Sequence, residues 1–195
     1  MAVSNRIRSR AMPRQATLAA VIAAAIAALP GLALAQEGPS LDVTLDFIRE
    51  KLSAMPAIGY AMSTTDTSNN QSWVNQFMDS YSNVVVNAST CIVSYHFKEL
   101  RDNASVVDGD DLLPLSRVTD IQTLSRDDHV RQVSAEQGHP SWVSKTSPSV
   151  TVLKIVRSDN QHNDIEFTDP SMAERLAKAF AHAAQLCGGL KPEAF

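Results

Sequence analysis

The pattern of hydrophobic and polar positions along this chain is first helical, then has a period of two, and is helical again at the end. In the first segment, apolar residues recur at intervals of four, three and four positions, which places them on one face of a helix. Ser40 precedes the segment as a candidate N-cap, and Pro56 follows it. The spacing therefore predicts an amphipathic helix over 41–52. Its apolar stripe consists of Leu41, Leu45, Ile48 and Leu52.

A polar run comes next, from Ser63 to Ser72, and contains only Ser, Thr, Asp, Asn and Gln. A segment of this composition has no apolar side chain to bury. We therefore predict an exposed, mobile loop over 63–72 inside one domain, rather than a boundary between two domains.

From Trp73 onward the period changes to two, which is typical of strands. The predicted strands are 73–78, 84–86 and 91–98, and the last two form a hairpin around Asn87-Ala88. Alternate positions from Cys91 to Phe97 share one apolar face, so Cys91 is expected to point into the core. His96 lies on the opposite, polar face, and we interpret it as a solvated residue rather than a catalytic base.

The middle of the chain carries weaker patterns. A short strand is predicted at 112–116, then a less regular segment with apolar contacts, then a short half-buried piece around Val130 and Val133. The run Asp108-Gly109-Asp110-Asp111 lacks the alternating oxygen ligands of an EF-hand, so it predicts a solvated acidic turn rather than a calcium site. Asp127-Asp128-His129 is interpreted as a surface turn, because adjacent side chains on an extended chain point in different directions. The apolar residues of the less regular segment after 112–116 are Val118, Ile121 and Leu124.

The last part of the chain has the clearest patterns. The β-branched, alternating segment 150–156 predicts a strand, and 165–167 predicts another after a polar loop at Asp159-Asn160. Asp169 is a candidate N-cap with Pro170 at the first helical position, and Gly188-Gly189 ends the helix. Its apolar face consists of Ala173, Leu176, Ala177, Phe180, Ala184 and Cys187.

The first 35 residues have the three parts of a secretory signal peptide. Arginines precede an apolar run over 17–29, and Ala33-Leu34-Ala35 is a small-x-small cleavage site. A retained membrane anchor is disfavoured because Pro30 and Gly31 end the run well short of the roughly 20 residues that span a bilayer. A lipoprotein is also disfavoured, because the residue after the cleavage site is Gln36 and not Cys. We expect export to the periplasm or the medium.

Cleavage changes the charge and leaves both cysteines in the chain. Four of the 17 basic residues and none of the 21 acidic residues precede Gln36, so the exported chain would carry a net charge of −8. Without a basic patch, such a chain is not expected to bind nucleic acid, and we expect no membrane insertion after cleavage. In an exported protein the two cysteines predict a Cys91–Cys187 disulfide, the alternative being two unrelated buried thiols.

The order of these elements resembles the pleckstrin-homology-like (PH-like) barrel. The resemblance runs from about Trp73 to Leu186 and rests on the 113–116 strand, on Val118 to Ile121, and on the 165–167 strand leading into the last helix. It implies an α+β fold: an antiparallel β-barrel or strongly bent sheet, closed by the C-terminal amphipathic helix. The helix at 41–52 would be an addition outside this fold. Residues 36–195 would form one domain.

The resemblance implies a scaffold for protein or peptide binding. The lipid binding of some PH-like domains depends on Lys and Arg near the first hairpin, and the matching turn, residues 87–90, has no basic residue. We do not transfer that activity.

Two functions remain open at this stage. The first is an exported, noncatalytic binding domain with an unknown protein or peptide partner, which would meet an exposed β-edge or the face around Trp142 and Val143. In this case we expect no catalytic, cofactor-binding or metal-binding residues. The second is a hydrolase assembled from residues distant in sequence. Its candidate residues are His96, His129, His139, His162 and His182, together with Asp108 and Asp128.

Overall fold

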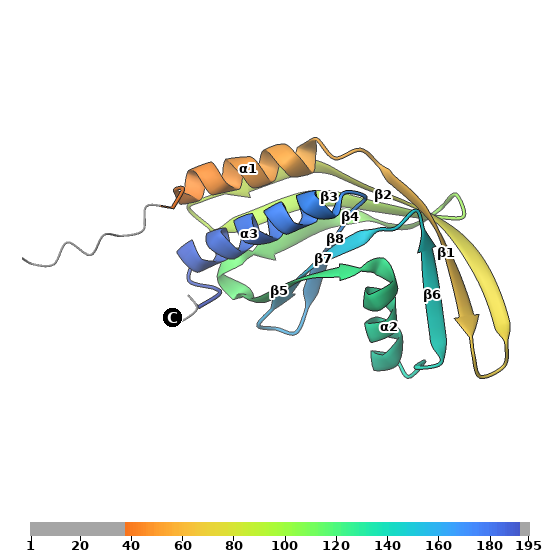
Figure 1. Ribbon diagram of the computed structural model, residues 1–195. Helices are drawn as coiled ribbons and strands as arrows, with labels where there is room; N and C mark the ends of the chain where they lie inside the picture. The colour runs from red at the N-terminus through yellow and green to blue at the C-terminus, as the bar shows by residue number, and fades with distance from the viewer. Residues whose placement is uncertain (1–37, 192–195) are drawn as a thin grey trace, which may run out of the picture. The chain divides into compact units, whose positions relative to one another are not determined.

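The computed structural model describes residues 38–191. The predicted signal peptide, residues 1–35, lies outside them. No helix within 38–191 is long and apolar enough to cross a membrane. The elements, in chain order, are α1 (Leu41–Ser53), β1 (Ile58–Asp66), β2 (Gln71–Asn87), β3 (Ile92–Arg101), β4 (Ala104–Pro114), the 3-10 turn η1 (Leu115–Arg117), β5 (Val118–Ser125), α2 (Arg126–Glu136), β6 (Trp142–Ser147), β7 (Thr151–Arg157), β8 (His162–Phe167) and α3 (Pro170–Leu186) (Figure 1).

The strands form two antiparallel sheets, and neither closes into a barrel. The first has the order β4-β3-β2-β1-β6, and the second has the order β5-β7-β8. Of the two expected forms, a barrel or a strongly bent sheet, the barrel is therefore wrong, while the α+β class, the antiparallel pairing and the C-terminal helix are confirmed. The chain leaves the first sheet at Pro114, which has no amide hydrogen to donate, and η1 redirects it into the second sheet.

The polar run at 63–72 is a β-hairpin and not a loop, which corrects the sequence-based prediction. β1 continues to Asp66, β2 begins at Gln71, and only the four residues between them form the turn. Backbone pairing does not need apolar side chains when one face of a hairpin is exposed. The Asp66 carboxylate also accepts hydrogen bonds from the Ser68 amide and the Ser141 hydroxyl, at 3.0 and 2.8 Å.

β2 is a single strand of 17 residues, so the predicted strands at 73–78 and 84–86 are its two ends. A register shift between Ser82 and Val85 interrupts its pairing with β3 and hid this continuity from the sequence pattern. Figure 1 shows that β1 and β2 bend strongly along their length. The bend gives the first sheet a concave face, with α1 packed on β2 and α2 packed beside β6.

Two segments interpreted as turns have regular structure. The run Asp108 to Asp111 lies inside β4. The segment that contains Asp127-Asp128-His129 is the first turn of α2, whose N-cap is Ser125. The helix was missed because its inward face carries charged residues that pair with β8, so the apolar repeat is weak.

α1 and α3 pack side by side and cover the main core (Figure 1). Both caps are confirmed: the Ser40 hydroxyl accepts from the Val43 amide, and the Asp169 carboxylate accepts from the Ser171 amide. The largest fully buried side chains of this core are Tyr95, Phe180, Leu45, Ile48, Leu52, Leu113, Leu115, Leu153, Ile155, Ile165, Leu176 and Val93.

The Cys91–Cys187 disulfide is confirmed, with the two Cα atoms 5.8 Å apart. The placement of Cys91 inside a strand was wrong, because it occupies the turn before β3 with a φ of +54°. Cys187 is the C-cap of α3. The bond therefore joins a turn of the first sheet to the end of the closing helix, and it is compatible with an exported protein.

Candidate functional site

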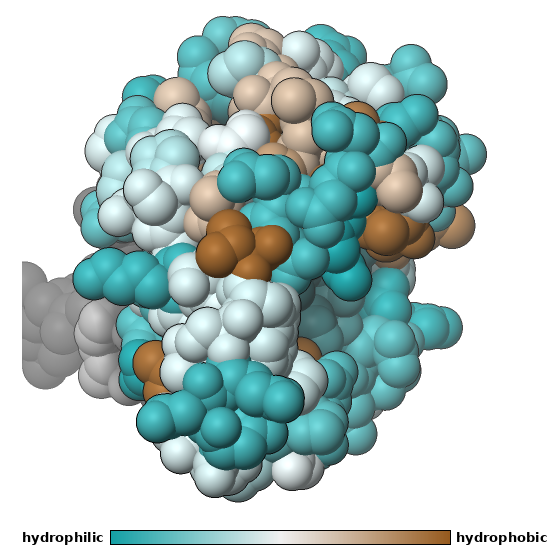
Figure 2. Space-filling model, turned by 90° about the vertical axis from the view of Figure 1, so that its right-hand side faces the viewer, coloured by the Kyte–Doolittle hydropathy of each residue, from teal (hydrophilic) through white to brown (hydrophobic). Residues whose placement is uncertain are grey.

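A cleft of about 350 Å³ lies between α2 and the hairpin of β1 and β2. One wall is α2 and the other is the concave face of the first sheet. Figure 2 shows the side of the molecule with this hairpin and β6, where small apolar groups are separated by hydrophilic residues. The cleft is lined by Met62, Thr64, Trp73, Asn75, Phe77, Arg101, Arg126, His129, Val130, Val133, Ser134, Gln137 and Trp142.

The alternation of side chains along β2 builds both the cleft and the core below it. Trp73, Asn75 and Phe77 point into the cleft, and the next two positions on the same face, Asp79 and Tyr81, are buried. Exposure falls along this row, because the outer half of the strand faces α2 and the inner half faces the main core. The row therefore connects an open aromatic surface to a buried carboxyl group.

The open end of the cleft is aromatic. The rings of Trp73 and Trp142 meet edge to face with centroids 5.2 Å apart, and His139 stacks on Trp142 at 4.2 Å. These are the only two tryptophans of the chain. Arg101 lies over the Phe77 ring at 5.3 Å and keeps about half of its side chain exposed. A ligand entering here meets flat aromatic surfaces and the guanidinium of Arg101, which also pairs with Glu99 at 3.3 Å.

A buried polar cluster lies under the cleft. The Arg126 guanidinium pairs with the Glu166 carboxylate, and both side chains are largely buried. The Tyr60 hydroxyl lies 3.2 Å from the Asp79 carboxyl and 3.3 Å from Glu166, and its single hydrogen can serve only one of them at a time. Burial, followed by the hydrogen bond and charge of Glu166, raises the pKa of Asp79 to about 9. Asp79 is therefore protonated at neutral pH, and the cluster has one carboxylate for one guanidinium.

α2 is held on β8 by two pairs of polar side chains. β8 presents His162, Asp164 and Glu166 on one face. Arg126 pairs with Glu166, and one turn later along α2 His129 approaches Asp164, with Nε2 3.0 Å from Oδ2. Arg126 and His129 are three residues apart and lie on one face of the helix, while Glu166 and Asp164 are two residues apart and lie on one face of the strand. The two pairs can therefore form at the same time.

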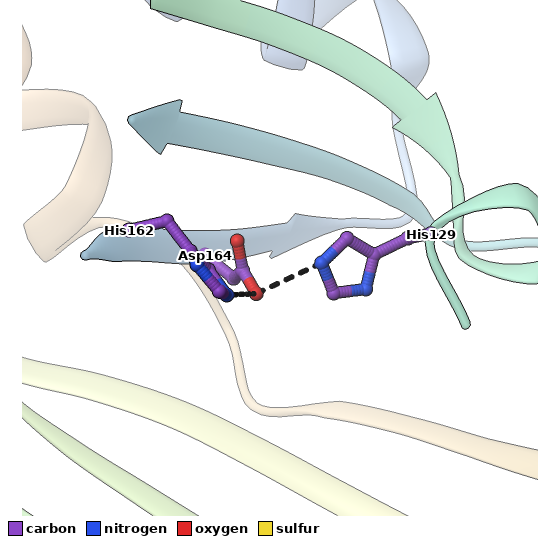
Figure 3. Close-up of side chains that lie close together, drawn as sticks. All are labelled: His129, His162 and Asp164. Carbon is purple, nitrogen blue, oxygen red and sulfur yellow. Dashed lines mark ion pairs between the residues drawn. The ribbon is translucent and has the colours of Figure 1, made fainter. Parts of the chain in front are cut away.

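His162 approaches the same carboxylate oxygen from its own strand, with Nε2 3.3 Å from Oδ2 of Asp164. Figure 3 shows both ion pairs meeting at this oxygen between the two imidazoles. Burial would raise the pKa of the Asp164 carboxyl, but the two neighbouring imidazoles hold it below its ordinary value. One ring nitrogen of His129, one of His162 and a carboxylate oxygen of Asp164 all lie within 4.8 Å of one another, close enough to contact one metal ion.

The other candidate histidines do not converge on this site. His139 stacks on Trp142, and His182 bonds the Pro39 carbonyl at 2.8 Å. Among residues 38–191, no histidine is hydrogen-bonded to a serine, threonine or cysteine side chain. Asp128 contacts Ser125 and Arg131 instead of a histidine. The hydrolase alternative stays a prediction without an assembled nucleophile and base.

His96 is bonded rather than simply solvated. Its two ring nitrogens contact Asp110 at 2.8 Å and Asp108 at 2.9 Å, across the pairing of β3 with β4. The hydrogen bond to Asp110, together with Asp108, raises the pKa of His96 above its ordinary value. Because the two nitrogens of one ring point in opposite directions, these two carboxylates do not share a common ligand position with it.

The predicted binding edge at Trp142 and Val143 is already occupied in part. Within residues 38–191, β6 pairs only with β1. Two of its amides on the open edge have partners: Trp142 donates to the His139 carbonyl, and Thr146 donates to the Asp127 carboxylate. Trp142 is half-buried and lines the cleft, whereas Val143 is exposed on the opposite face of the strand. A partner strand at this edge would have to displace α2.

Sequence reasoning missed Asp79, Arg126, Asp164 and Glu166. One signal was available: the alternation His162, Asp164, Glu166 opposite Ile165 and Phe167 is a period-two pattern with charges on one side. Nothing local indicated which element would cover that charged face.

No family model, no curated protein and no solved structure matches this chain.

Proposed function

We propose that this chain, in its exported form, is a noncatalytic binding domain that takes a large apolar or aromatic side chain of a peptide partner into the cleft between α2 and β1–β2. The observation that carries the proposal is the pairing of Trp73 with Trp142 at the open end of a hollow whose lining is about equally polar and apolar. Half-exposed tryptophans are typical of sites that bury a partner's side chain.

The size of the cleft favours a side chain over a large cofactor. At about 350 Å³ it is near the lower limit of ligand pockets. Asn75, Ser134 and Gln137 add neutral hydrogen-bonding groups that suit a peptide backbone. Arg101, whose side chain is half exposed, already pairs with Glu99 at 3.3 Å, so an acidic residue beside the apolar one would share this guanidinium with Glu99. Peptide binding is also what the resemblance to PH-like domains implied, although this fold lacks their closed barrel.

The test is selection of a random-peptide display library on the exported chain, followed by fluorescence titration of the selected peptides. Both tryptophans report on the cleft, so binding should change the emission. We expect selected peptides to contain an aromatic or large aliphatic residue next to an acidic one.

Two variants distinguish binding in the cleft from nonspecific binding elsewhere on the surface. Val133→Asp places a charge in the cleft, while Val143→Asp places the same charge on the exposed opposite face of β6. We expect at least tenfold weaker binding for Val133→Asp and unchanged binding for Val143→Asp. Selection that enriches no peptide, or peptides that bind both variants like the parent chain, would contradict the proposal.

A further inference from the structure

The side chains of His129, His162 and Asp164 each offer one possible ligand atom, and these three atoms lie within 4.8 Å of one another. They come from two elements: His129 is on α2, and the other two occupy alternate positions of β8 (Figure 3). Asp164 Oδ2 lies 3.0 Å from one imidazole Nε2 and 3.3 Å from the other. Ligand atoms around a tetrahedral zinc ion, with bonds of about 2.0–2.2 Å, are about 3.3 Å apart. The two measured separations are close to this value.

Two atoms of the cluster are buried without a hydrogen-bond partner. They are His129 Nε2 and Asp164 Oδ1. The His129 side chain is only 7% exposed, and its contact with Asp164 lacks hydrogen-bond geometry. A buried polar atom without a partner costs about 1–3 kcal/mol. Coordination of a cation would satisfy the imidazole nitrogen and orient the carboxylate.

The cluster is also accessible. The His162 side chain is 37% exposed and that of Asp164 is 24% exposed. An ion could enter from solvent beside His162, and rotation of this exposed side chain would bring its Nε2 closer to that of His129. Three protein ligands would leave a fourth tetrahedral position for water or for a donor atom of a bound molecule.

We propose that His129, His162 and Asp164 bind one divalent first-row transition metal ion, with Zn²⁺ as the best-suited probe. Two imidazoles and a carboxylate match the ligand preference of such ions, whereas calcium prefers oxygen ligands only. Asp164 supplies the negative charge, since Glu166 is paired with Arg126. Lys154 lies opposite Asp164 in the pairing of β7 with β8 and works against a cation. We therefore expect a dissociation constant on the order of micromolar, weaker than that of a structural zinc site.

The site goes beyond the proposed peptide binding, although His129 also lines the cleft. Its sequence signal is weak because the ligands are separated by more than 30 positions, between His129 and His162. That separation explains why no local motif indicated a metal site.

The test is isothermal titration of the exported, chelator-treated chain with ZnCl₂, repeated with CoCl₂ while the visible absorption is recorded. We expect one ion per chain and a cobalt spectrum typical of four-coordinate geometry. The key variant is His162→Gln, because this ligand is partly exposed and its loss should leave the fold intact. We expect at least tenfold weaker zinc binding for His162→Gln and for Asp164→Asn.

The matched control is His96→Gln. His96 also lies between two carboxylates but does not converge with them on one ligand position. Its zinc affinity should equal that of the parent chain. Absence of zinc binding, or binding that is unchanged in His162→Gln, would overturn the proposal and leave His129–Asp164 as an ion pair that holds α2 on β8. Peptide binding is measured separately, so either proposal can fail without the other.

Discussion

The guanidinium of Arg126, the first residue of α2, is paired with the carboxylate of Glu166 in the interior beneath the cleft. This contact fixes the start of the helix that forms one wall of the cleft. Asp79, which also neighbours Glu166, holds a proton at neutral pH because burial and the nearby Glu166 raise its pKa to about 9.

Removal of the guanidinium should destabilise the fold strongly. Arg126→Met leaves Glu166 buried without a counter-charge, which costs about 3–5 kcal/mol in the free energy of unfolding. Arg126→Met combined with Glu166→Gln should lose less than the sum of the two single variants. The control is Arg49→Met, which breaks an exposed pair with Asp46 and should cost less than about 1 kcal/mol. Urea unfolding measures the stability of the two single variants, the double variant and the control. A loss for Arg126→Met as small as that of the control would show that the buried pair does not stabilise the fold.

The protonated Asp79 should make stability fall as pH rises. Its folded-state pKa, about 9, is above the ordinary value, so the folded chain keeps a proton that the unfolded chain releases. The stabilisation that comes from the Asp79 proton is complete below about pH 4 and is lost as pH rises toward 9. Over this range the free energy of unfolding falls by at most about 1.4 kcal/mol per pH unit. Asp79→Asn should flatten the dependence between pH 5 and 8.5, measured by urea midpoints. Asp46→Asn, an exposed control, should keep the slope of the parent chain, and an equal slope for Asp79→Asn would refute the assignment.

The disulfide should contribute a large part of the stability. It closes a loop with a sequence separation of 96, for which the chain-entropy model gives about 3–5 kcal/mol. Replacement of both cysteines by serine should lower the melting temperature by roughly 10 °C. Calorimetry measures the change, and thiol titration of the denatured, unreduced parent chain should detect no free thiol. Two free thiols in freshly purified protein would contradict the bond.

Gly189 should not tolerate a side chain. A Cβ at this position would overlap the Leu115 carbonyl oxygen and also meet the backbone of Val118, so the end of α3 would have to move away from η1 and β5. We expect Gly189→Ala to lose about 1–3 kcal/mol. Gly109→Ala on β4 is the control, because nothing lies within 4 Å of its added Cβ. Thermal unfolding compares the two, and equal midpoints would mean that the contact at Gly189 relaxes freely.

Local patterns predicted the elements whose signals lie within a few residues. The caps of α1 and α3, the apolar stripe of α3 and the hairpin before β3 are local features, and each was confirmed. The disulfide was also predicted, because the compartment and the cysteine count limit the choices to one pair. The segment 63–72 was misassigned because amino-acid composition does not show which backbone segments pair. A hairpin with one exposed face tolerates polar residues at nearly every position.

The candidate sites depended on the tertiary structure. The sequence by itself determined that β8 alternates charged and apolar residues, but only the fold placed α2 over the charged face and brought His129 to Asp164. The expectation of a barrel was wrong for the same reason, because the choice between one sheet and two depends on strand partners far apart in the chain. Contacts between distant segments are set by the packing of the whole core, and no local period encodes them.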